Sequence, residues 1–182
     1  VQRGGFNRTL HPDIESQFPD AYIGMGLTAE NLANSHQISR TNQELFAASS
    51  HEKAIIAQER GYLRDEIVSV EGVSLDGCMR PPNLEKMAQL NPAFVENGTV
   101  TAATSSPLTD GAAAMLVCSE EFATTHGLKP LASIISTAVS GVPPEIMGYG
   151  PVPSSLKALQ RAGLSMDDLD VIELNEAFSA QS

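Results

Sequence analysis

Tryptophan is absent from this 182-residue sequence, and cysteine occurs only twice, as Cys78 and Cys118. The two cysteines have neither metal-ligand nor redox spacing, so a disulfide framework is excluded and a reducing compartment is indicated. No apolar run approaches the roughly 18 residues that a membrane-spanning helix needs. We also expect no signal peptide at the start of the chain. The sequence therefore predicts a protein that works in a reducing, aqueous compartment.

Basic residues are scarce as well. Lysine and arginine total 11 against 22 aspartates and glutamates, which gives a formal net charge of −11. This balance argues against nucleic acid as a partner, because phosphate binding needs a basic surface. Hydrophobic residues make up 42% of the chain, which is enough for a globular core. The length corresponds to one domain or to parts of two.

Start and stop signals predict five helices. Thr28 is expected to cap a helix that ends near residue 36, and the Thr41–Glu44 capping box is expected to open a longer one over 41–60. Asn83 is expected to cap a short helix to residue 90, and Ser119 to open another that Gly127 ends. The last is predicted over 154–162, and residues 1–20 are predicted to be loop.

Continuous apolar runs predict buried β-strands. We expect strands at 67–70, 112–118, 131–139 and 171–174. Their alternation with helices after residue 111 indicates an α/β layered domain. Cys118 is expected to be a small core residue of the second strand. The acidic run at 166–170 is expected to cap a short turn before the last strand, and we expect no metal site there.

Some motifs that suggest chemistry have ordinary explanations. The Gly-Tyr-Gly at 148–150 is no dinucleotide fingerprint, because Pro153 takes the third glycine position. Cys78 lies in a loop and is a weak candidate for a reactive thiol. None of the four histidines has a partner at metal-ligand spacing, so we interpret them as surface or hydrogen-bonded residues: His11, His36, His51 and His126.

Two segments leave a structural and a functional interpretation open. The hydroxyl-rich loop at 104–111 precedes a predicted strand, where it either caps the next element or meets a ligand. Asn175 follows the strand at 171–174, and ligands bind outside the carboxyl ends of strands in open α/β sheets. Its amide either caps a following helix or serves as a donor for a developing oxyanion.

Six motifs in order resemble the thiolase family over nearly the whole chain, from about residue 20 to the end. They are MGLTAEN at 25–31, NPAF at 91–94, GTVTA at 98–102, Ser106 with DGAAA at 110–114, MGYGPVP at 147–153 and NEAF at 175–178. The first motif is most similar to the degradative 3-ketoacyl-CoA thiolases of fatty-acid β-oxidation. The chain starts at Val1 and stops just after the last motif, so we expect it to be an internal fragment of a longer protein.

The resemblance implies a layered αβαβα fold made of two similar α/β halves, with a loop domain inserted in the first. Residues 1–108 would be mostly this loop domain. Residues 109–129 would supply the closing strand and helix of the N-terminal half, and residues 130–182 the start of the C-terminal half.

The resemblance also implies acyl transfer between a 3-ketoacyl-CoA and coenzyme A, which is a substrate, with no further cofactor and no metal. The family's nucleophilic cysteine would lie upstream of this chain, and its Gly-His-Pro histidine and second cysteine downstream. Neither Cys78 nor Cys118 matches them, so the fragment alone is expected to be inactive. Asn175 matches the residue that holds a water for the thioester oxyanion. The remaining matches are substrate-binding positions: Met25, Arg80, Phe94, Ser106, Leu108, Met147, Ala177 and Phe178.

Several expectations about direction and partners accompany the resemblance. A biosynthetic acetoacetyl-CoA thiolase is an alternative, although Gly24 stands where some members have histidine and so leaves room for longer acyl chains. An oligomerisation or partner-docking module is an alternative of another class. The full-length protein is expected to form a homodimer or homotetramer, with a possible partner subunit in a multienzyme complex. It would be cytoplasmic, or lie in the mitochondrial matrix in a eukaryote.

Overall fold

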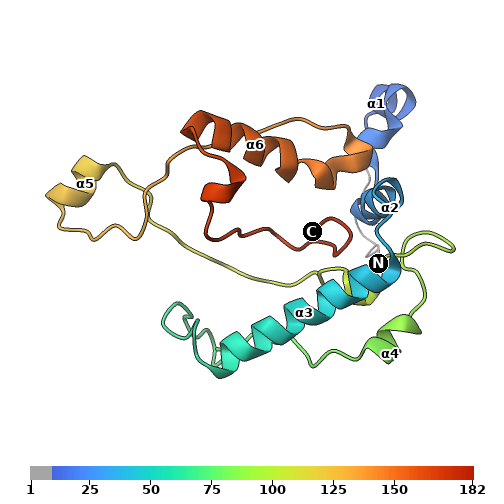
Figure 1. Ribbon diagram of the computed structural model, residues 1–182, viewed down its shortest axis with the longest axis horizontal. Coiled ribbons are helices and arrows are strands. Elements are labelled where there is room, and N and C mark those ends of the chain that lie inside the picture. The colour runs from blue at the N-terminus through green and yellow to red at the C-terminus, as the bar shows by residue number, and fades with distance from the viewer. Residues whose placement is uncertain (1–9) are drawn as a thin grey trace. The chain divides into compact units, whose positions relative to one another are not determined.

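The computed structural model describes residues 10–182, which divide into two compact units (Figure 1). The first unit contains residues up to 107 together with 141–150 and 173–182, and the second contains 108–140 and 151–172. The segments 141–150 and 173–182 return to the first unit, so residues distant in sequence meet there.

Short helices joined by irregular chain make up both units. The helices of the first unit are α1 (Pro12–Gln17), η1 (Pro19–Tyr22), α2 (Met25–Ser35), α3 (Arg40–Glu59), α4 (Leu84–Ala88), η2 (Ala102–Thr104) and η3 (Pro144–Tyr149). Those of the second unit are α5 (Glu120–Thr125), α6 (Pro151–Ala162) and η4 (Met166–Asp168). The prediction of loop over 1–20 is wrong for α1 and η1, which each begin at a proline, and its first nine residues lie outside the described part.

Three predicted helices are confirmed, two of them with the predicted cap. Asn83 accepts a hydrogen bond from the Lys86 N–H at the start of α4, and Ser119 does the same from Phe122 at the start of α5. The long helix α3 lies within one residue of its predicted bounds, and Gly61 follows its end with φ of +68°. Its cap, however, is Ser39 and not Thr41, and Glu44 pairs with Arg40 instead of closing a capping box.

The two other helices start earlier than predicted. Helix α2 begins at Met25, and Thr28 is buried inside it, where its hydroxyl donates to the Met25 carbonyl at 2.7 Å. Helix α6 begins at Pro151, because proline suits the first turn, where no intrahelical N–H partner is needed. Gly163 ends α6 with φ of +69°, as expected.

The four predicted strands are wrong as elements of this structure. Only Val70 of the first makes a bridge, with Val73, and no paired strand occurs anywhere in residues 10–182. The predicted burial is also wrong, since Met115, Leu131 and Val171 are 87%, 100% and 77% exposed and Cys118 is exposed. The physical reason is that an extended segment becomes a strand only beside a neighbour that pairs its N–H and C=O groups. These segments have no such neighbour among the described residues.

The core of the first unit lies where α2 meets the segment around Val100 and the last residues of the chain. Ala29, Ala33, Val100 and Ala180 are almost fully buried, and Ile38 and Phe178 pack against them. This cluster attaches the segment after Asn175 to the unit. It therefore fixes the backbone that leads into the candidate site.

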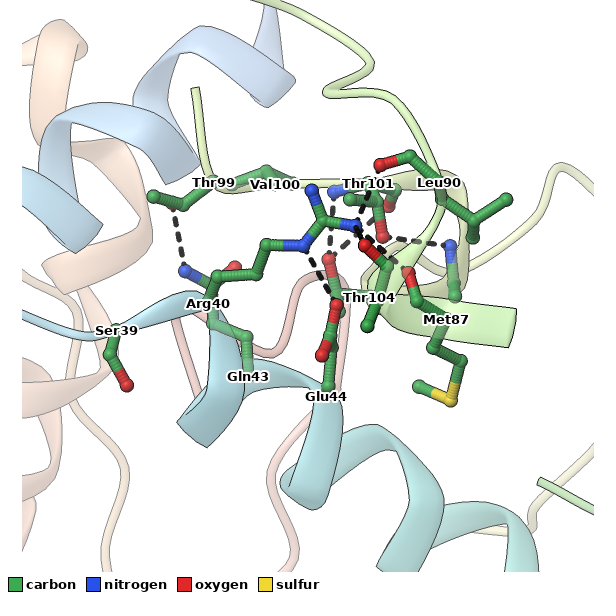
Figure 2. A network of polar contacts seen from close by, with 12 residues as sticks. Ser39, Arg40, Gln43, Glu44, Met87, Leu90, Thr99, Val100, Thr101 and Thr104 are labelled. Carbon is green, nitrogen blue, oxygen red and sulfur yellow. Dashed lines mark hydrogen bonds and ion pairs between the residues drawn. The ribbon is translucent and has the colours of Figure 1, made fainter. Parts of the chain in front are cut away.

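Arg40, at the start of α3, joins that helix to α4. Its Nε donates to Glu44 at 2.7 Å, and its Nη2 donates to the carbonyls of Met87 and Leu90 at 2.8 and 2.7 Å. Figure 2 shows the guanidinium between the Glu44 carboxylate and those carbonyls. The Glu44 side chain is only 8% exposed, so the ion pair is largely shielded from water. The planar fork of arginine satisfies carboxylate and carbonyls together, which a lysine cannot do.

Replacing this arginine by lysine should loosen α4. We expect Arg40→Lys to lower stability by about 1–2 kcal/mol, because hydrogen bonds from a charged donor are lost. Amide exchange over residues 84–90, measured by mass spectrometry, should speed up while exchange in α2 does not change. Arg60→Lys is the matched control, since Arg60 is exposed and its guanidinium contacts the hydroxyl and ring of Tyr62. Equal exchange in the two variants would show that the Arg40 fork does not hold α4.

The second unit is arranged along α6. Hydrogen bonds connect this helix to the segment 136–139. They are donated by Ser136, Lys157 and Arg161, and the Ser136 hydroxyl, for example, donates to the Ala158 carbonyl at 2.7 Å. The acidic run forms the turn that we predicted, because Asp168 accepts hydrogen bonds from the Ser165 N–H and hydroxyl. Those bonds lower the pKa of Asp168, which is fully exposed to solvent.

Candidate functional site

Two segments that are far apart in sequence pair at the centre of the candidate site. The Ser106 N–H donates to the Ala177 carbonyl, and the Ser179 N–H donates to the Thr104 carbonyl, both at 2.9 Å. Ser105 and Phe178 face each other across this short antiparallel bridge. Three predicted substrate-binding residues, Ser106, Ala177 and Phe178, are therefore brought together.

Internal hydroxyl bonds shape the first of these segments. Thr101 caps η2, and the Thr104 hydroxyl accepts from the Thr101 N–H at 2.9 Å. The Ser105 hydroxyl donates to the Thr101 carbonyl at 2.8 Å. Both hydroxyls thus bond back to the start of η2, and neither caps the element after the loop as the structural interpretation expects. Ser106 is exposed and follows this ordered turn, and Pro107 has no N–H to offer to a ligand.

Aromatic rings of two predicted residues meet beside the paired segments. Phe94 and Phe178 stand edge to face with their centroids 5.8 Å apart. Gly26 lies against the Phe94 ring, where an added Cβ would come within 2.2 Å of Cδ1. Because Met25 precedes this glycine at the start of α2, Met25 also belongs to this part of the unit. The ring can approach α2 so closely only because residue 26 has no side chain.

Met147 lies on η3, which packs on α2. The Asn31 amide donates to the Glu145 carbonyl at 2.9 Å, and Gly148 approaches Leu32 and Gln181 so closely that a Cβ there would come within 2.8 Å of each. Met147 itself is 46% exposed. The first unit therefore contains six of the predicted substrate-binding residues near one another or on elements packed together: Met25, Phe94, Ser106, Met147, Ala177 and Phe178.

A small cavity of mixed polar and apolar lining adjoins the paired segments. Its volume is about 160 Å³, and its lining includes Ser50 and His51 of α3 together with Ser105, Ser106 and Glu176. The Ser50 hydroxyl donates to Glu176 Oε2 at 2.5 Å. Because the acceptor is a carboxylate, this hydrogen bond is charge-assisted. The cavity thus has hydroxyl, imidazole and carboxylate groups on one side of the predicted site.

The remaining predicted residues are placed as follows. Arg80 is exposed, and its N–H donates to Nδ1 of His51 at 3.3 Å, so this loop lies against α3. Cys78, nearby, is half-buried, and its N–H donates to the Asp76 carboxylate. Leu108 belongs to the second unit and is 99% exposed. Asn175 is exposed, and the residues after it form a turn, not the helix that we expected.

Ser50 and Glu176 are not among the residues that the sequence predicts for the site, and its pattern indicates a surface or hydrogen-bonded histidine at His51. His51 is half-buried with its Nδ1 occupied, in agreement with that interpretation. The signal for Ser50 and His51 is their position on the helix. Ala47 and Ala48 form the buried side of α3, and the residues one turn further along that side are polar. Polar side chains on the buried face of a helix have partners in the fold.

Neither a metal centre nor a membrane segment emerges from residues 10–182. In this range no three histidine, cysteine or carboxylate side chains are grouped as metal ligands. No helix in the same residues is long and apolar enough to cross a membrane.

Comparison with protein families gives two matches in sequence order. Residues 8–121 match the family model described as "Thiolase, N-terminal domain", and residues 128–182 match "Thiolase, C-terminal domain". Two relatives named 3-ketoacyl-CoA thiolase, from Aliivibrio fischeri and Vibrio parahaemolyticus, are 54% and 50% identical over 95% of this chain. The chain covers 48% and 47% of their own lengths, so it spans about half of the curated relatives it matches.

A solved structure gives the same result for the fold. The crystal structure of the Bacillus anthracis acetyl-CoA acetyltransferase matches the whole of this chain with a TM-score of 0.84 and 39% identity. The chain covers 48% of that protein. The predicted layered α/β fold is confirmed by this similarity, even though the extended segments of this chain have no strand partners among residues 10–182.

Proposed function

The chain belongs to the thiolase family, and we propose that it is a segment of a degradative 3-ketoacyl-CoA thiolase. The full-length enzyme transfers an acyl group between a 3-ketoacyl-CoA and coenzyme A. Its nucleophilic cysteine, histidine and second cysteine would come from the rest of the protein. No cofactor beyond the substrate coenzyme A is needed, because the acyl group is carried on a cysteine.

The pairing of residues 104–106 with 177–179 is the observation that supports this proposal best. It places Ser106, proposed to contact the pantetheine arm, beside Ala177 and Phe178, proposed to line the acyl channel. Asn175 is two residues before the pairing and exposed, and its amide has no hydrogen-bond partner within residues 10–182, which allows it to hold a water. Phe94, edge-on to Phe178, extends the apolar side of the same channel. Arg80, near His51, is proposed to reach the coenzyme A nucleotide, and Leu108 and Met147 to contact the rest of the ligand.

The test of this function is thiolysis by the full-length protein. With coenzyme A and a 3-ketoacyl-CoA, we expect cleavage to acetyl-CoA and a shortened acyl-CoA. The loss of absorbance of the 3-ketoacyl group measures this cleavage. A purified full-length protein that binds coenzyme A but cleaves no 3-ketoacyl-CoA of any chain length would contradict the proposal.

Gly24 provides a test of degradative against biosynthetic specificity. It caps α2, and an added Cβ there would meet nothing within 4 Å, so this position leaves open space before Met25. We expect Gly24→His to reduce kcat/KM for long-chain substrates relative to acetoacetyl-CoA by about 10-fold or more, since blocking a pocket by a few atoms costs this much discrimination. The ratio of the two kcat/KM values is the measurement, and Gly77→His, at an equally open loop position, is the control. A wild-type preference for acetoacetyl-CoA would favour the biosynthetic alternative.

A role in assembly has its own support. In the segment 62–75, which contains the Val70–Val73 turn, Tyr62, Val68, Val73 and Leu75 are 64–82% exposed. Apolar side chains exposed in this way are typical of contact surfaces. We propose that this turn takes part in homo-oligomer or partner contacts of a cytoplasmic enzyme, in addition to catalysis. Light scattering of full-length protein with Val68→Asp, compared with wild type, tests the homo-oligomer contact.

A further inference from the structure

Helix α3 reaches the candidate site through Ser50, and this contact has no counterpart in the proposed chemistry. The Ser50 hydroxyl donates to the carboxylate of Glu176, which directly follows Asn175. We propose that Ser50 is a positioning residue, which acts through Glu176 to hold Asn175 in place. This inference rests on the proposed function, in which the Asn175 amide orients a water.

Few contacts hold the backbone around Asn175 within residues 10–182. Residues 171–174 are exposed and make no bridge to any described residue. The backbone pairing with residues 104–106 begins only at the Ala177 carbonyl. Within the described chain, the Ser50–Glu176 hydrogen bond is thus the anchor nearest to Asn175 in sequence. Without it, the first anchor after Asn175 in the described chain would be the Ala177 carbonyl, two residues further on.

Small displacements at this position are costly to catalysis. The amide of Asn175 has to place a water within hydrogen-bond distance of the oxygen on which charge develops, about 3 Å away. A misplacement of about 1 Å caused by a change outside the reacting groups can reduce the rate about 100-fold. The helix gives Ser50 the rigidity that this task requires, because α3 is 20 residues long and is attached to α4 through Arg40.

The same contact should matter little to stability. Glu176 is exposed, so its carboxylate returns to water when the hydroxyl is removed, and no buried polar group is left without a partner. A positioning role and a structural role therefore have opposite signatures. The first lowers kcat at constant melting temperature, whereas the second lowers the melting temperature and leaves the turnover of each folded molecule unchanged.

The experiment compares Ser50→Ala with Ser49→Ala in the full-length enzyme. Ser49 is the neighbouring residue of the same helix, and its side chain makes no hydrogen bond within residues 10–182. We expect Ser50→Ala to lower kcat by about 10- to 100-fold with KM for coenzyme A and Tm nearly unchanged. Ser49→Ala should match wild type in all three quantities. Ser50→Thr retains a hydroxyl and should recover most of kcat.

A double-mutant cycle then decides whether Ser50 acts through Asn175. When Asn175→Ala is already present, Ser50→Ala should cause little further loss of kcat, because there is no amide left to position. Additive losses, or equal kcat for the Ser50→Ala and Ser49→Ala variants of an active enzyme, would overturn the inference while leaving the proposed function intact. A fall in Tm without a fall in kcat would also overturn it. Wild-type enzyme without thiolysis would overturn the proposed function, and this inference with it.

Discussion

Asn175→Ala in the full-length enzyme is expected to lower kcat by about 10²–10³, which corresponds to roughly 3–4 kcal/mol of transition-state stabilisation. The amide proposed to hold a water against the thioester oxygen is removed, whereas the groups proposed to perform the covalent chemistry are not altered. Since the oxyanion forms only during the reaction, KM should change less than kcat. Melting temperature should fall little, because Asn175 is exposed. Steady-state kinetics and thermal unfolding of the same preparation give both quantities.

Asn175→Asp separates this role from helix capping. Aspartate caps helices about as well as asparagine, so a capping residue would tolerate this change, while its replacement by alanine would cost about 1 kcal/mol of stability. If Asn175 has the catalytic role, the negative charge of the new carboxylate raises the energy of the developing oxyanion beside it. The loss in kcat should then be at least as large as for alanine. Turnover that survives Asn175→Asp would contradict the catalytic role. In this structure residues 179–181 form a turn and not a helix, so Asn175 has no following helix to cap within the described residues.

The helices could be predicted because their signals are local. Asn83 and Ser119 each cap a helix whose first N–H groups lie two to three residues away, and Gly61 ends α3 within one residue of its last turn. The predicted starts of α2 and α6 are too late, because in each case a weaker start signal lies before the stronger one on which the prediction rests. Gly24 begins α2 without a side-chain cap, so Thr28 looked like the better start although it lies one turn inside.

The sequence identifies apolar segments that are typical of strands, but none of them forms a paired strand within residues 10–182. The apolar segments at 112–118 and 131–139 form no helix, as expected of strands, yet their large apolar side chains are exposed. Hydrophobic content predicts that a segment is buried once a sheet exists, but it does not supply the neighbouring strand. Pairing is a long-range property, and a central strand without neighbours retains neither its hydrogen bonds nor its burial.

The sequence predicts individual residues of the candidate site but not which of them contact one another. The order of the motifs pointed to Ser106, Asn175 and Phe178, but nothing in the sequence near Ser106 indicates that its N–H meets the Ala177 carbonyl. The same holds for the contact of Ser50 with Glu176, which joins residues 126 positions apart. Such contacts depend on how α2, α3 and the end of the chain pack, which no local pattern encodes.

Glu30 is expected to be the residue whose loss destabilises the first unit most. Its carboxylate accepts hydrogen bonds from the Thr99 N–H at 2.9 Å, from the Val100 N–H at 2.8 Å and from the Thr99 hydroxyl at 3.1 Å. Val100 is fully buried in the core cluster, and its carbonyl accepts from the Ala93 N–H next to Phe94. The carboxylate also lies so close to Gly98 that a Cβ there would come within 2.2 Å of Oε1. One side chain of α2 thus holds the whole turn that leads into η2.

Glu30→Ala should therefore lower the free energy of unfolding by about 3–5 kcal/mol, because two backbone N–H groups lose their acceptor and each unsatisfied buried donor costs about 1–3 kcal/mol. Glu30→Gln retains one carbonyl oxygen and should fall between alanine and wild type. Glu96→Ala is the control, since Glu96 is an exposed glutamate close to the same turn. Thermal unfolding of the full-length variants gives the order of stability, and amide exchange at residues 99 and 100 locates the change. If Glu30→Ala melted with Glu96→Ala and residues 99 and 100 stayed protected, the turn would be held by the core packing of Val100 and not by the carboxylate.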